Sequence, residues 1–359
     1  MKKHKIEKIL IVKPSSLGDV VHALPALEII KEQYPNAKID WLVNPLFADV
    51  LEFSADIDNI VAFNRKRLGK IISFIPEFFS LLSELKRGKY DLVFDFQGLF
   101  RSAFFSRLAS RNVIGFKEPR EKIASRFYKH KVAVAAEGVH AIERNCQMVC
   151  NYLDIDFKVP VVTLAETANF SQEVDDIFRD NGISEADEYM VIVPGARWAS
   201  KVWPSEFFAK VIQEISGKNN AIKFICVGTS ADDISAQKIQ ELSGEFSEKV
   251  YSFTGKTSVG GMIEILRRSK GVITNDSGPM HIAAVLGVPT FALFGATDPA
   301  KTGPFGNNTY AYLADIECRK CLKRWCPKVA SNDEILPCHG AIDVNSLVSD
   351  VLAELSNGK

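Results

Sequence analysis

The sequence places one carboxylate directly after a buried strand near the amino terminus. Residues 9–12 are apolar without alternation, which indicates a parallel strand covered on both faces. A Ser-Ser-Leu-Gly turn ending at Gly18 follows, and Asp19 comes next at the start of a helix. Open α/β sheets bind ligands at the carboxyl ends of their strands, so Asp19 can act there as a general base. The alternative, which its residue type favours, is a helix N-cap.

A second candidate loop follows an apolar run at residues 191–193. It contains Gly195, Arg197 and Lys201, and Pro204 marks the start of a helix. Loop amides and a helix N-terminus supply positive potential, and Lys201 adds a mobile cation, so this pattern suits a diphosphate. An ordinary strand-to-helix loop with a surface lysine is the alternative.

A third loop follows a buried strand expected at residues 271–274. Asn275, Asp276, Ser277 and Gly278 form a burst of polar and small residues, and His281 comes one turn later. Such residues are good helix caps, but this burst is longer than a cap needs. Ser277 and Gly278 can donate backbone amides to phosphate oxygens. His281 either faces the same ligand or is a buried core histidine.

Two further strands end in the same way. Gly228 to Asp232 follow the strand expected at residues 221–227, and Gly295 to Pro299 follow the strand expected at 290–294. Four independent caps are a poor explanation for four such loops at strand carboxyl ends. Together they predict a pocket for a nucleotide diphosphate.

The elements that position these loops alternate between strand and helix. Such units predict parallel sheets with right-handed crossovers, here in two Rossmann-like domains. In the first half we expect strands at 9–12, 38–43, 91–94 and 113–114, and helices at 20–33, 74–86 and 101–110. In the second half we expect strands at 189–193, 221–227, 250–253, 271–274 and 290–294, and helices at 205–216, 230–242, 261–269, 281–286 and 344–355.

The length of 359 residues exceeds what one core usually supports. We expect an N-terminal Rossmann-like domain over residues 1–165, a linker region over 166–188 with an acidic, solvated helix, and a C-terminal Rossmann-like domain over 189–359. The second domain also carries a cysteine-containing loop at 318–339 and a C-terminal helix.

The composition is that of an ordinary globular protein, with 47% hydrophobic and 25% charged residues. The 44 basic and 44 acidic side chains balance, so nothing supports a nucleic acid partner. No apolar run reaches the roughly 18 residues of a spanning helix, and the start resembles no signal peptide. Cys146, Cys150 and Cys226 lie in segments typical of a core, which favours a reducing compartment. We therefore expect a cytoplasmic protein.

The other four cysteines form a cluster, Cys318, Cys321, Cys326 and Cys338. Their spacing could hold structural zinc or iron on a small knuckle. The alternative is a loop whose thiols stay reduced or pair on oxidation.

Several motifs, taken in order, resemble those of glycosyltransferase family 9, which contains the lipopolysaccharide heptosyltransferases. The likeness covers residues 9–298. Its motifs are Lys-Pro-Ser-Ser-Leu-Gly-Asp ending at Asp19, the segments 95–102 and 140–144, the loop at Lys201, Asn275–His281, and Phe294–Pro299.

The resemblance implies a GT-B fold, with two Rossmann-like domains facing across a cleft, donor on the second and acceptor on the first. It implies inverting, metal-independent transfer of heptose from ADP-heptose to the lipopolysaccharide inner core or a related glycan, with no cofactor required. Asp19 would be the general base and Lys201 would contact the diphosphate. The donor set would be Ser16, Gly18, Gly195, Arg197, Asp232, Asp276, Ser277, Gly278 and His281. Two threonines of one branch of the family are here Ala196 and Arg197.

The expected acceptor is a lipid-linked or core oligosaccharide at the inner membrane surface, used by a monomeric enzyme. An anionic acceptor would suit the basic first domain, because arginine grips phosphate and carboxylate at two points. The candidate contacts are Arg65, Arg101, Arg120 and Arg144. Each is also a candidate for the solvated surface, and Glu143 could form a structural ion pair with Arg144. No amphipathic anchor stands out.

Other functions fit the same pattern. A protein O-heptosyltransferase and a GT-B nucleotide-sugar epimerase share the architecture, and a non-catalytic scaffold would bind nucleotide without turnover. Donor incubated without acceptor would give product only in the epimerase.

Overall fold

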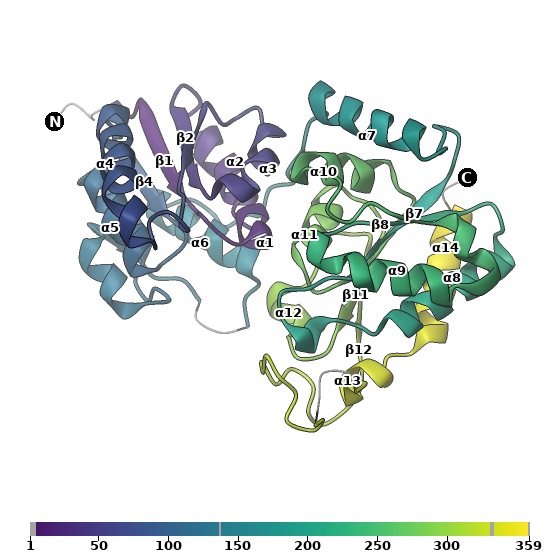
Figure 1. Cartoon of the computed structure of the whole chain (residues 1–359). Helices are drawn as coiled ribbons and strands as arrows, with labels where there is room; N and C mark the ends of the chain where they lie inside the picture. Colours follow the sequence, from purple (N-terminus) through teal and green to yellow (C-terminus); the bar gives the residue numbers. More distant parts are fainter. Residues whose placement is uncertain (1–4, 136–137, 331–333, 358–359) are drawn as a thin grey trace. The chain divides into compact units, whose positions relative to one another are not determined.

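The chain folds into two compact units, Met1–Ala165 and Glu166–Lys359, in a computed structural model. The structure describes residues 5–135, 138–330 and 334–357. In each unit a six-stranded parallel sheet lies between layers of helices (Figure 1). The expected class, two Rossmann-like domains with parallel sheets, is confirmed.

The first unit has the strand order β3-β2-β1-β4-β5-β6. Its strands are β1 (Lys8–Val12), β2 (Lys38–Val43), β3 (Asn59–Ala62), β4 (Leu92–Asp95), β5 (Val113–Phe116) and β6 (His130–Val132). Its helices are α1 (Leu17–Val21), α2 (Leu24–Gln33), α3 (Asp49–Glu52), α4 (Ile71–Gly88), α5 (Phe100–Ala109) and α6 (Ala141–Leu153), with 3-10 turns η1 (Pro45–Phe47) and η2 (Lys122–Phe127). In β1, Leu10 lies opposite Asp40 of β2 and Val93 of β4.

The helices of this unit cover both faces of its sheet. α2 packs on α6, whereas α4 packs on α5 and α5 on η2. Because β1 and β4 run through the centre, their residues are almost fully buried, and this explains their unbroken apolar sequence.

The second unit repeats the same topology, with the strand order β12-β11-β10-β7-β8-β9. Its strands are β7 (Tyr189–Val193), β8 (Lys223–Cys226), β9 (Val250–Ser252), β10 (Val272–Asn275), β11 (Thr290–Phe294) and β12 (Thr309–Leu313). Its helices are α7 (Ala168–Asp180), α8 (Ser205–Lys218), α9 (Asp233–Leu242), α10 (Val259–Arg268), α11 (Gly278–Val285), α12 (Pro299–Thr302), α13 (Pro337–Gly340) and α14 (Val344–Asn357), with 3-10 turns η3 (Ala199–Lys201), η4 (Ser230–Asp232) and η5 (Gly244–Lys249).

The expected strands all appear, and the differences lie at edges and helix starts. The helix expected over 20–33 is two helices, α1 and α2, with Pro25 in the first turn of α2. The strands β3, β6 and β12 and the helices α3, α6, α12 and α13 were not expected from the sequence. β3 and β6 are edge strands of four and three residues, too short and too polar to show a pattern.

The acidic segment after Ala165 forms a helix that packs on the second sheet's helical layer. α7 lies against α10, and Val174 is buried between them and the rest of the unit. The Glu173 carboxylate accepts hydrogen bonds from the backbone N–H and the hydroxyl of Ser258, at 2.7 and 2.6 Å. These bonds give hydrogen-bond partners to Ser258, the N-cap residue of α10.

The C-terminal segment also packs within the second unit. α14 lies on α8, and Leu347, Val348 and Val351 join the core there. In α13 the backbone oxygen of His339 accepts a hydrogen bond of 3.1 Å from the Trp203 indole. Within the described residues, no helix is both long and apolar enough to cross a membrane.

The four clustered cysteines are free thiols. Cys338 is buried, and burial raises the pKa of its thiol to about 11, with smaller contributions from Cys326, Cys318 and Cys321. Among the described residues, no group of three or more Cys, His, Asp or Glu side chains has an arrangement that could hold a metal ion.

His339 gives the second unit a pH-dependent stability. Burial lowers the pKa of its ring to about 4, from 6.5 in an exposed histidine. The folded protein therefore holds the neutral ring, and this contribution to stability is complete above pH 6.5 and lost as the pH falls toward 4. His339→Leu removes the titration and keeps the backbone bond to Trp203. We expect the free energy of unfolding of the wild type, relative to that of His339→Leu, to fall by about 3 kcal/mol between pH 7 and pH 4. Urea titrations at several pH values measure it, and a pH-independent difference would contradict the assignment.

Candidate active site

In an open α/β sheet, a ligand crevice is expected at the carboxyl ends of the two central strands between which the strand order reverses. In the first unit the chain builds outward from β1 through β2 and β3, and then returns to add β4 on the other side of β1. The loops after β1 and β4 therefore leave in opposite directions, which opens a binding site at that point. The Lys13 ammonium, from the first loop, donates a 3.0 Å hydrogen bond to the Phe96 oxygen in the second.

Asp19 lies at the mouth of this crevice, in the first turn of α1. Its Oδ2 accepts hydrogen bonds from the backbone N–H of Ser16 at 2.7 Å and from the Ser16 hydroxyl at 2.8 Å. Ser16 is the N-cap, so the N-cap alternative for Asp19 is wrong: it is the N3 partner in a capping box. Gly18 lies inside the same helical turn, outside the left-handed backbone region. The carboxylate is thus held in one orientation while its side chain stays 41% exposed.

Lys13 places a positive charge beside that carboxylate. Its side chain is only 9% exposed, and its Nζ lies 3.5 Å from Asp19 Oδ1. A buried ammonium is costly unless its donors find partners, and here the Phe96 oxygen and Asp19 supply them. Lys13 therefore fixes the approach of the two loops and the position of the acid.

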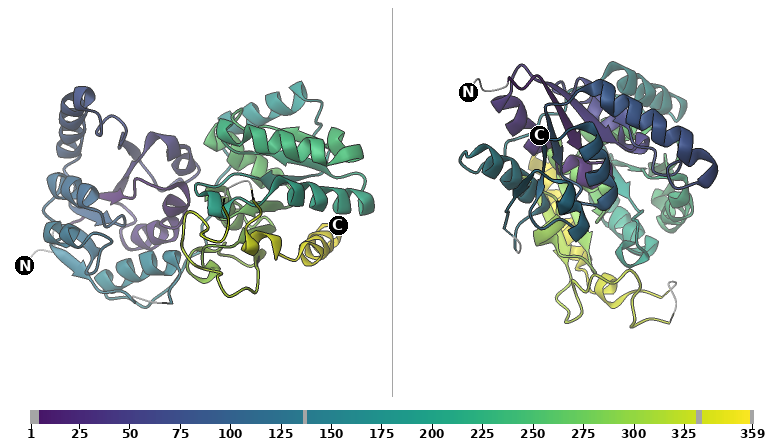
Figure 2. Two further views of the ribbon diagram at one scale, coloured as in Figure 1. Left: turned by 60° about the horizontal axis from the view of Figure 1, so that its bottom comes forward. Right: turned by 90° about the vertical axis from the view of Figure 1, so that its left-hand side faces the viewer.

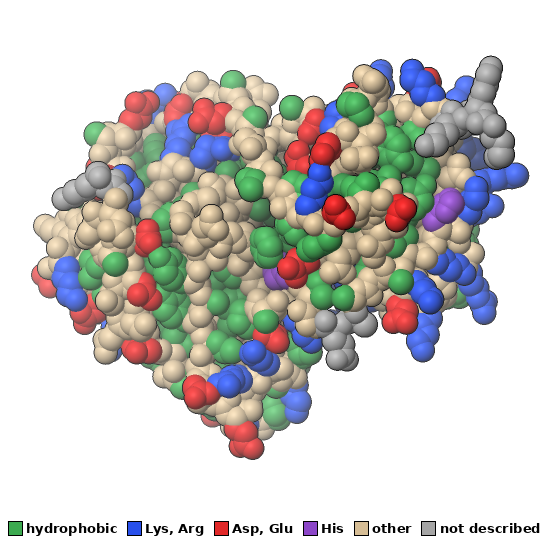
Figure 3. Space-filling model, turned by 180° about the vertical axis from the view of Figure 1, so that it is seen from behind, with side chains coloured by type: hydrophobic (Ala, Val, Ile, Leu, Met, Phe, Trp, Pro, Cys, Tyr) green, Lys and Arg blue, Asp and Glu red, His purple; other side chains and the backbone are tan. Residues whose placement is uncertain are grey.

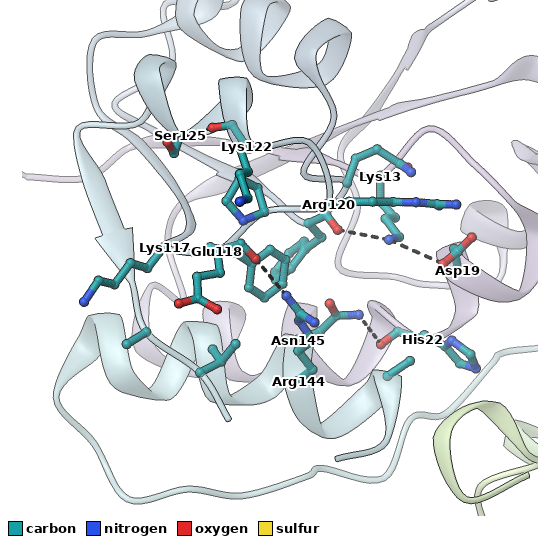
Figure 4. A pocket seen from close by; sticks show the side chains of 17 residues that line it. Lys13, Asp19, His22, Lys117, Glu118, Arg120, Lys122, Ser125, Arg144 and Asn145 are labelled. Atoms are coloured by element: carbon teal, nitrogen blue, oxygen red, sulfur yellow. Dashed lines mark hydrogen bonds and ion pairs between the residues drawn. The ribbon is translucent and has the colours of Figure 1, made fainter. Parts of the chain in front are cut away.

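These residues line a pocket of about 1010 Å³ in the first unit (Figure 4). Its charged lining residues are Lys13, Asp19, Lys117, Glu118, Arg120, Lys122 and Arg144. Five cations against two carboxylates give the pocket a positive potential, although the whole chain is neutral. The pocket therefore suits an anionic ligand, and it places the Asp19 carboxylate within reach of that ligand.

The start of α6 forms one wall of the pocket. His140 is the N-cap, and its backbone N–H donates to Glu143 at 2.9 Å, so Glu143 completes a capping box; the ion pair with Arg144 was only an alternative. The Arg144 guanidinium lies 4.8 Å from the centre of the Phe116 ring and donates a 3.0 Å hydrogen bond to the backbone oxygen of Glu118. Figure 4 shows the next residue, Asn145, bonded to the backbone oxygen of His22, at 2.9 Å.

The structure separates the four expected acceptor arginines into two pairs. Arg120 and Arg144 line the pocket. Arg65, in the turn before α4, and Arg101, on α5, are exposed and do not line it. Sequence reasoning gave no role to Lys13, Lys117 and Lys122, which do line it. For Lys13 the signal was its place next to the strand end, where a buried strand meets a polar loop.

Behind the pocket, a buried carboxylate shapes the loop after β4. Asp95 accepts four hydrogen bonds, from the backbone N–H groups of Gln97 and Gly98 and from the hydroxyls of Ser102 and Tyr128. Burial raises the pKa of Asp95, and these four bonds offset part of the rise. Gly98 has a φ of +67°, which favours glycine. The loop is thereby fixed with Gln97 facing the pocket.

The second unit reverses its strand order between β7 and β10, so the corresponding crevice is expected at the ends of these two strands. Asn275, at the end of β10, is fully buried and ties the loop after β7 to the sheet. Its amide donates a 2.6 Å bond to the Pro194 oxygen and its carbonyl oxygen accepts a 3.1 Å bond from the Trp203 N–H. One side chain thereby sets both ends of the loop that carries Lys201.

Lys201 and Asp276 form an ion pair inside this crevice. The Nζ–Oδ2 distance is 2.7 Å, and the side chains are 17% and 5% exposed. The Thr297 hydroxyl donates a 2.5 Å bond to the same carboxylate oxygen. The Lys201 ammonium also lies 4.9 Å from the centre of the Trp198 ring. Three loops, after β7, β10 and β11, therefore meet at one charged pair.

Asp232 brings a fourth loop to the same edge of the sheet. Its Oδ2 accepts hydrogen bonds from the Thr229 N–H and hydroxyl at 2.8 and 2.9 Å. A Cβ placed on Gly195 would lie 2.1 Å from Asp232 Oδ1, so only glycine lets these loops approach this closely. A Cβ placed on Gly228 would lie 2.7 Å from Asp232 Oδ2, the other oxygen of the same carboxylate.

The remaining expected donor residues lie around this pair or on other elements. Ser277 is the N-cap of α11 and Gly278 its first residue, so their amides lie at the positive end of the helix. His281 is 8% exposed in the same helix, and Arg197 is exposed on the loop after β7. Ser16 and Gly18 lie beside Asp19 in the first unit.

Asn275 offers a test of how the second crevice is held. Asn275→Ala leaves a buried backbone oxygen at Pro194 and a buried N–H at Trp203 without partners. We expect the free energy of unfolding to fall by about 2–4 kcal/mol in urea denaturation. Asn308→Ala is the control, because its side chain is exposed and bonds the Gly287 oxygen at 3.1 Å; it should cost less than about 1 kcal/mol. Equal losses would contradict the role given to Asn275.

Comparison with known proteins bears on both crevices. Residues 78–330 match Glycosyltransferase family 9 (heptosyltransferase). Lipopolysaccharide heptosyltransferase 1 of Pseudomonas aeruginosa is 30% identical over 330 residues, which cover 89% of this chain and 87% of that protein. The chain is a member of glycosyltransferase family 9.

Further similarities support this membership. Lipopolysaccharide heptosyltransferase 1 of Escherichia coli K12 is 29% identical over 316 residues, covering 86% of this chain and 94% of that protein. The solved structure of the E. coli heptosyltransferase WaaC with ADP is similar with a TM-score of 0.75 and 26% identity, over 97% of this chain and 99% of that one. The same enzyme with ADP-2-deoxy-2-fluoro heptose gives a TM-score of 0.69 and 27% identity, over 86% and 93%. This family 9 chain is thus a glycosyltransferase.

Proposed function

We propose that this family 9 enzyme transfers a heptose from ADP-heptose to an acceptor of the lipopolysaccharide inner core, with inversion and without a catalytic metal. The observation that carries the proposal is the pair of crevices. One holds an oriented carboxylate in a cationic pocket, and the other holds a partly buried lysine among loops suited to a diphosphate. The related enzymes named above are lipopolysaccharide heptosyltransferases, and two of the similar structures contain ADP or an ADP-heptose analogue.

Asp19 is the proposed general base. A sugar hydroxyl has a pKa far above neutrality, so it attacks efficiently only as a carboxylate takes its proton. The two bonds from Ser16 and the neighbouring Lys13 hold this carboxylate in place before substrate arrives. The hydroxyl oxygen then bonds to the anomeric carbon as the bond to the ADP oxygen breaks, and a single displacement inverts the configuration.

Lys201 is the proposed stabiliser of the leaving ADP. An ammonium has three N–H donors, and Asp276 engages one of them, so the others can be directed at diphosphate oxygens. The amides of Ser277 and Gly278 add partial positive charge at the same sheet edge. Negative charge on the diphosphate grows as the glycosidic bond breaks, so these groups bind the transition state more strongly than the ground state.

The acceptor is proposed to bind in the pocket of the first unit. Arg120 and Arg144, with Lys117 and Lys122, present cations to phosphate or carboxylate groups near Asp19. Arg65 and Arg101 lie outside this pocket, so the first acceptor contacts are assigned to Arg120 and Arg144. Purified protein incubated with ADP-heptose and a panel of truncated core acceptors tests the whole proposal; no product with any acceptor would overturn it.

Replacement of Asp19 tests the base. Asp19→Asn keeps an oxygen that can cap α1 but cannot take a proton, so kcat should fall roughly a hundredfold or more while donor affinity stays unchanged. Initial rates with ADP-heptose and acceptor measure it. Asp58→Asn is the matched control, because Asp58 accepts a 2.8 Å bond from the Ile39 N–H and does not line the pocket. Full activity in Asp19→Asn would refute the role.

Replacement of Lys201 tests the diphosphate contact. Lys201→Ala removes the cation and leaves the buried Asp276 carboxylate beside the ligand, so the Kd for ADP should rise roughly tenfold or more. Isothermal titration calorimetry measures it. Lys223→Ala is the matched control. Lys223 begins β8 and its Nζ lies 2.7 Å from Asp187 Oδ2, so its removal breaks a similar ion pair and should leave the Kd for ADP unchanged. An unaltered Kd in Lys201→Ala would discard this contact.

A further inference from the structure

Helix α4 of the first unit exposes three large apolar side chains. Phe74, Ile75 and Phe79 are 45%, 63% and 61% exposed. Figure 2 shows α4, in dark blue, on the outside of the helical layer that covers its sheet. Leaving three such side chains in water is unfavourable, and clustered exposed apolar residues mark interaction surfaces.

The exposed parts of Ile75 and Phe79 are not used by the packing of the unit. Leu81 and Leu85 of α4 are buried in its core; Phe74 lies on the same stripe of the helix, seven and eleven residues earlier, whereas Ile75 and Phe79 lie about 80–160° around the helix from that stripe. Phe78 packs between them and α5, with ring centres 5.8 Å from Phe105 and 6.4 Å from Phe104. The helix is therefore anchored through this stripe, and the exposed side chains of Ile75 and Phe79 are available for another contact.

Basic residues lie at both ends of the same helix. Residues 65–89 contain seven Lys and Arg and two Glu, a net charge of +5 in a chain whose total is zero. Exposed Lys66 and Lys70 precede the apolar side chains, and exposed Lys86 and Arg87 follow them. Of the two acids, Glu77 is 16% exposed and lies 3.1 Å from Arg67. On the left-hand side of the face drawn in Figure 3, by contrast, acidic and basic side chains are interspersed.

An apolar centre between two cationic ends matches the surface of an anionic bilayer. The 18 residues of α4 span about 27 Å. A helix of this kind lies in the plane of the interface, with its apolar side among the acyl chains and its cations among the headgroups. Each Lys or Arg near the surface gains from the negative potential of anionic lipids. The sequence did not suggest this anchor, because it shows neither which side of the helix is covered nor how exposed the rest is.

We propose that the α4 surface, centred on Ile75, Phe79 and Lys86 and flanked by Phe74, Lys70 and Arg87, docks the protein on an anionic lipid bilayer. This inference rests on the proposed function in one respect: docking brings the first unit to the membrane that holds a lipid-linked acceptor. The contact with lipid itself follows from the exposed side chains and their charge alone.

Vesicle sedimentation tests the docking directly. The full chain is mixed with vesicles of phosphatidylethanolamine and phosphatidylglycerol, and in parallel with vesicles of phosphatidylcholine. We expect binding to the anionic vesicles only, and a loss of most binding at about 0.5 M NaCl, where surface charge is screened. Equal binding to both vesicle types, or binding to neither, would overturn the proposal.

Two variants of the full chain locate the contact. Ile75→Ser with Phe79→Ser removes apolar area, and Lys70→Glu with Lys86→Glu reverses charge, each at exposed positions that the fold does not use. Either pair should weaken binding to anionic vesicles roughly tenfold or more. The matched control pair is Val161→Ser with Ile234→Ser, which are 90% and 80% exposed on other elements and should bind as wild type. Wild-type binding by both α4 pairs would refute the location.

Activity on two acceptors separates this inference from the proposed function. Both α4 pairs should keep wild-type turnover of a deacylated, water-soluble core acceptor and lose activity on the same core embedded in anionic vesicles. If the wild type is inactive on both acceptors, the proposed function fails, whereas the vesicle-binding result still decides the docking. If Ile75→Ser with Phe79→Ser instead dissociates an oligomer seen by light scattering and leaves vesicle binding intact, the α4 surface is a contact between copies of this chain and the proposal is wrong.

Discussion

In each unit, one buried polar side chain joins the two loops that leave the sheet where its strand order reverses. In the first unit Lys13 reaches across to the Phe96 oxygen, and in the second Asn275 bonds both Pro194 and Trp203. A buried polar group without partners is unstable, so each bond can form only if the loops take one relative position. The positions of Asp19 and Lys201 both follow from this constraint.

The two units share a topology but differ in what they place at the crevice. The first has a cation beside an exposed carboxylate, in a pocket rich in lysine and arginine. The second has Lys201 paired with Asp276 and lying over the Trp198 ring, and Thr297 bonds the same carboxylate. Gly195 lets the neighbouring loop that carries Asp232 approach closely. Under the proposed function, the same fold serves proton transfer in one unit and diphosphate binding in the other, because function resides in the loops and not in the sheet.

The sequence was sufficient for the central strands and for the loops that follow them. Unbroken apolar runs such as 189–193 indicate buried parallel strands. The polar and small residues that follow them indicate the loops at the carboxyl ends of the strands, where ligands are expected. It was insufficient for edge strands such as β6, whose three residues carry no periodicity. It also could not separate Arg120 and Arg144 from Arg65 and Arg101, because residue type does not show which side chains converge in space. Asp19 appeared to be either a cap or a base, yet a carboxylate with two oxygens can complete a cap and still face the pocket.

The pairing of Lys201 with Asp276 also bears on selectivity among anions. The Lys201 charge is already paired with Asp276 before any ligand arrives, so part of its attraction for a simple anion is neutralised. A ligand must instead match several fixed donors at once, which a bridged pair of phosphates attached to a sugar and a nucleoside can do and a lone tetrahedral ion cannot. Under the proposed function, the paired resting state of the loop therefore favours a nucleotide-linked diphosphate over a simple anion.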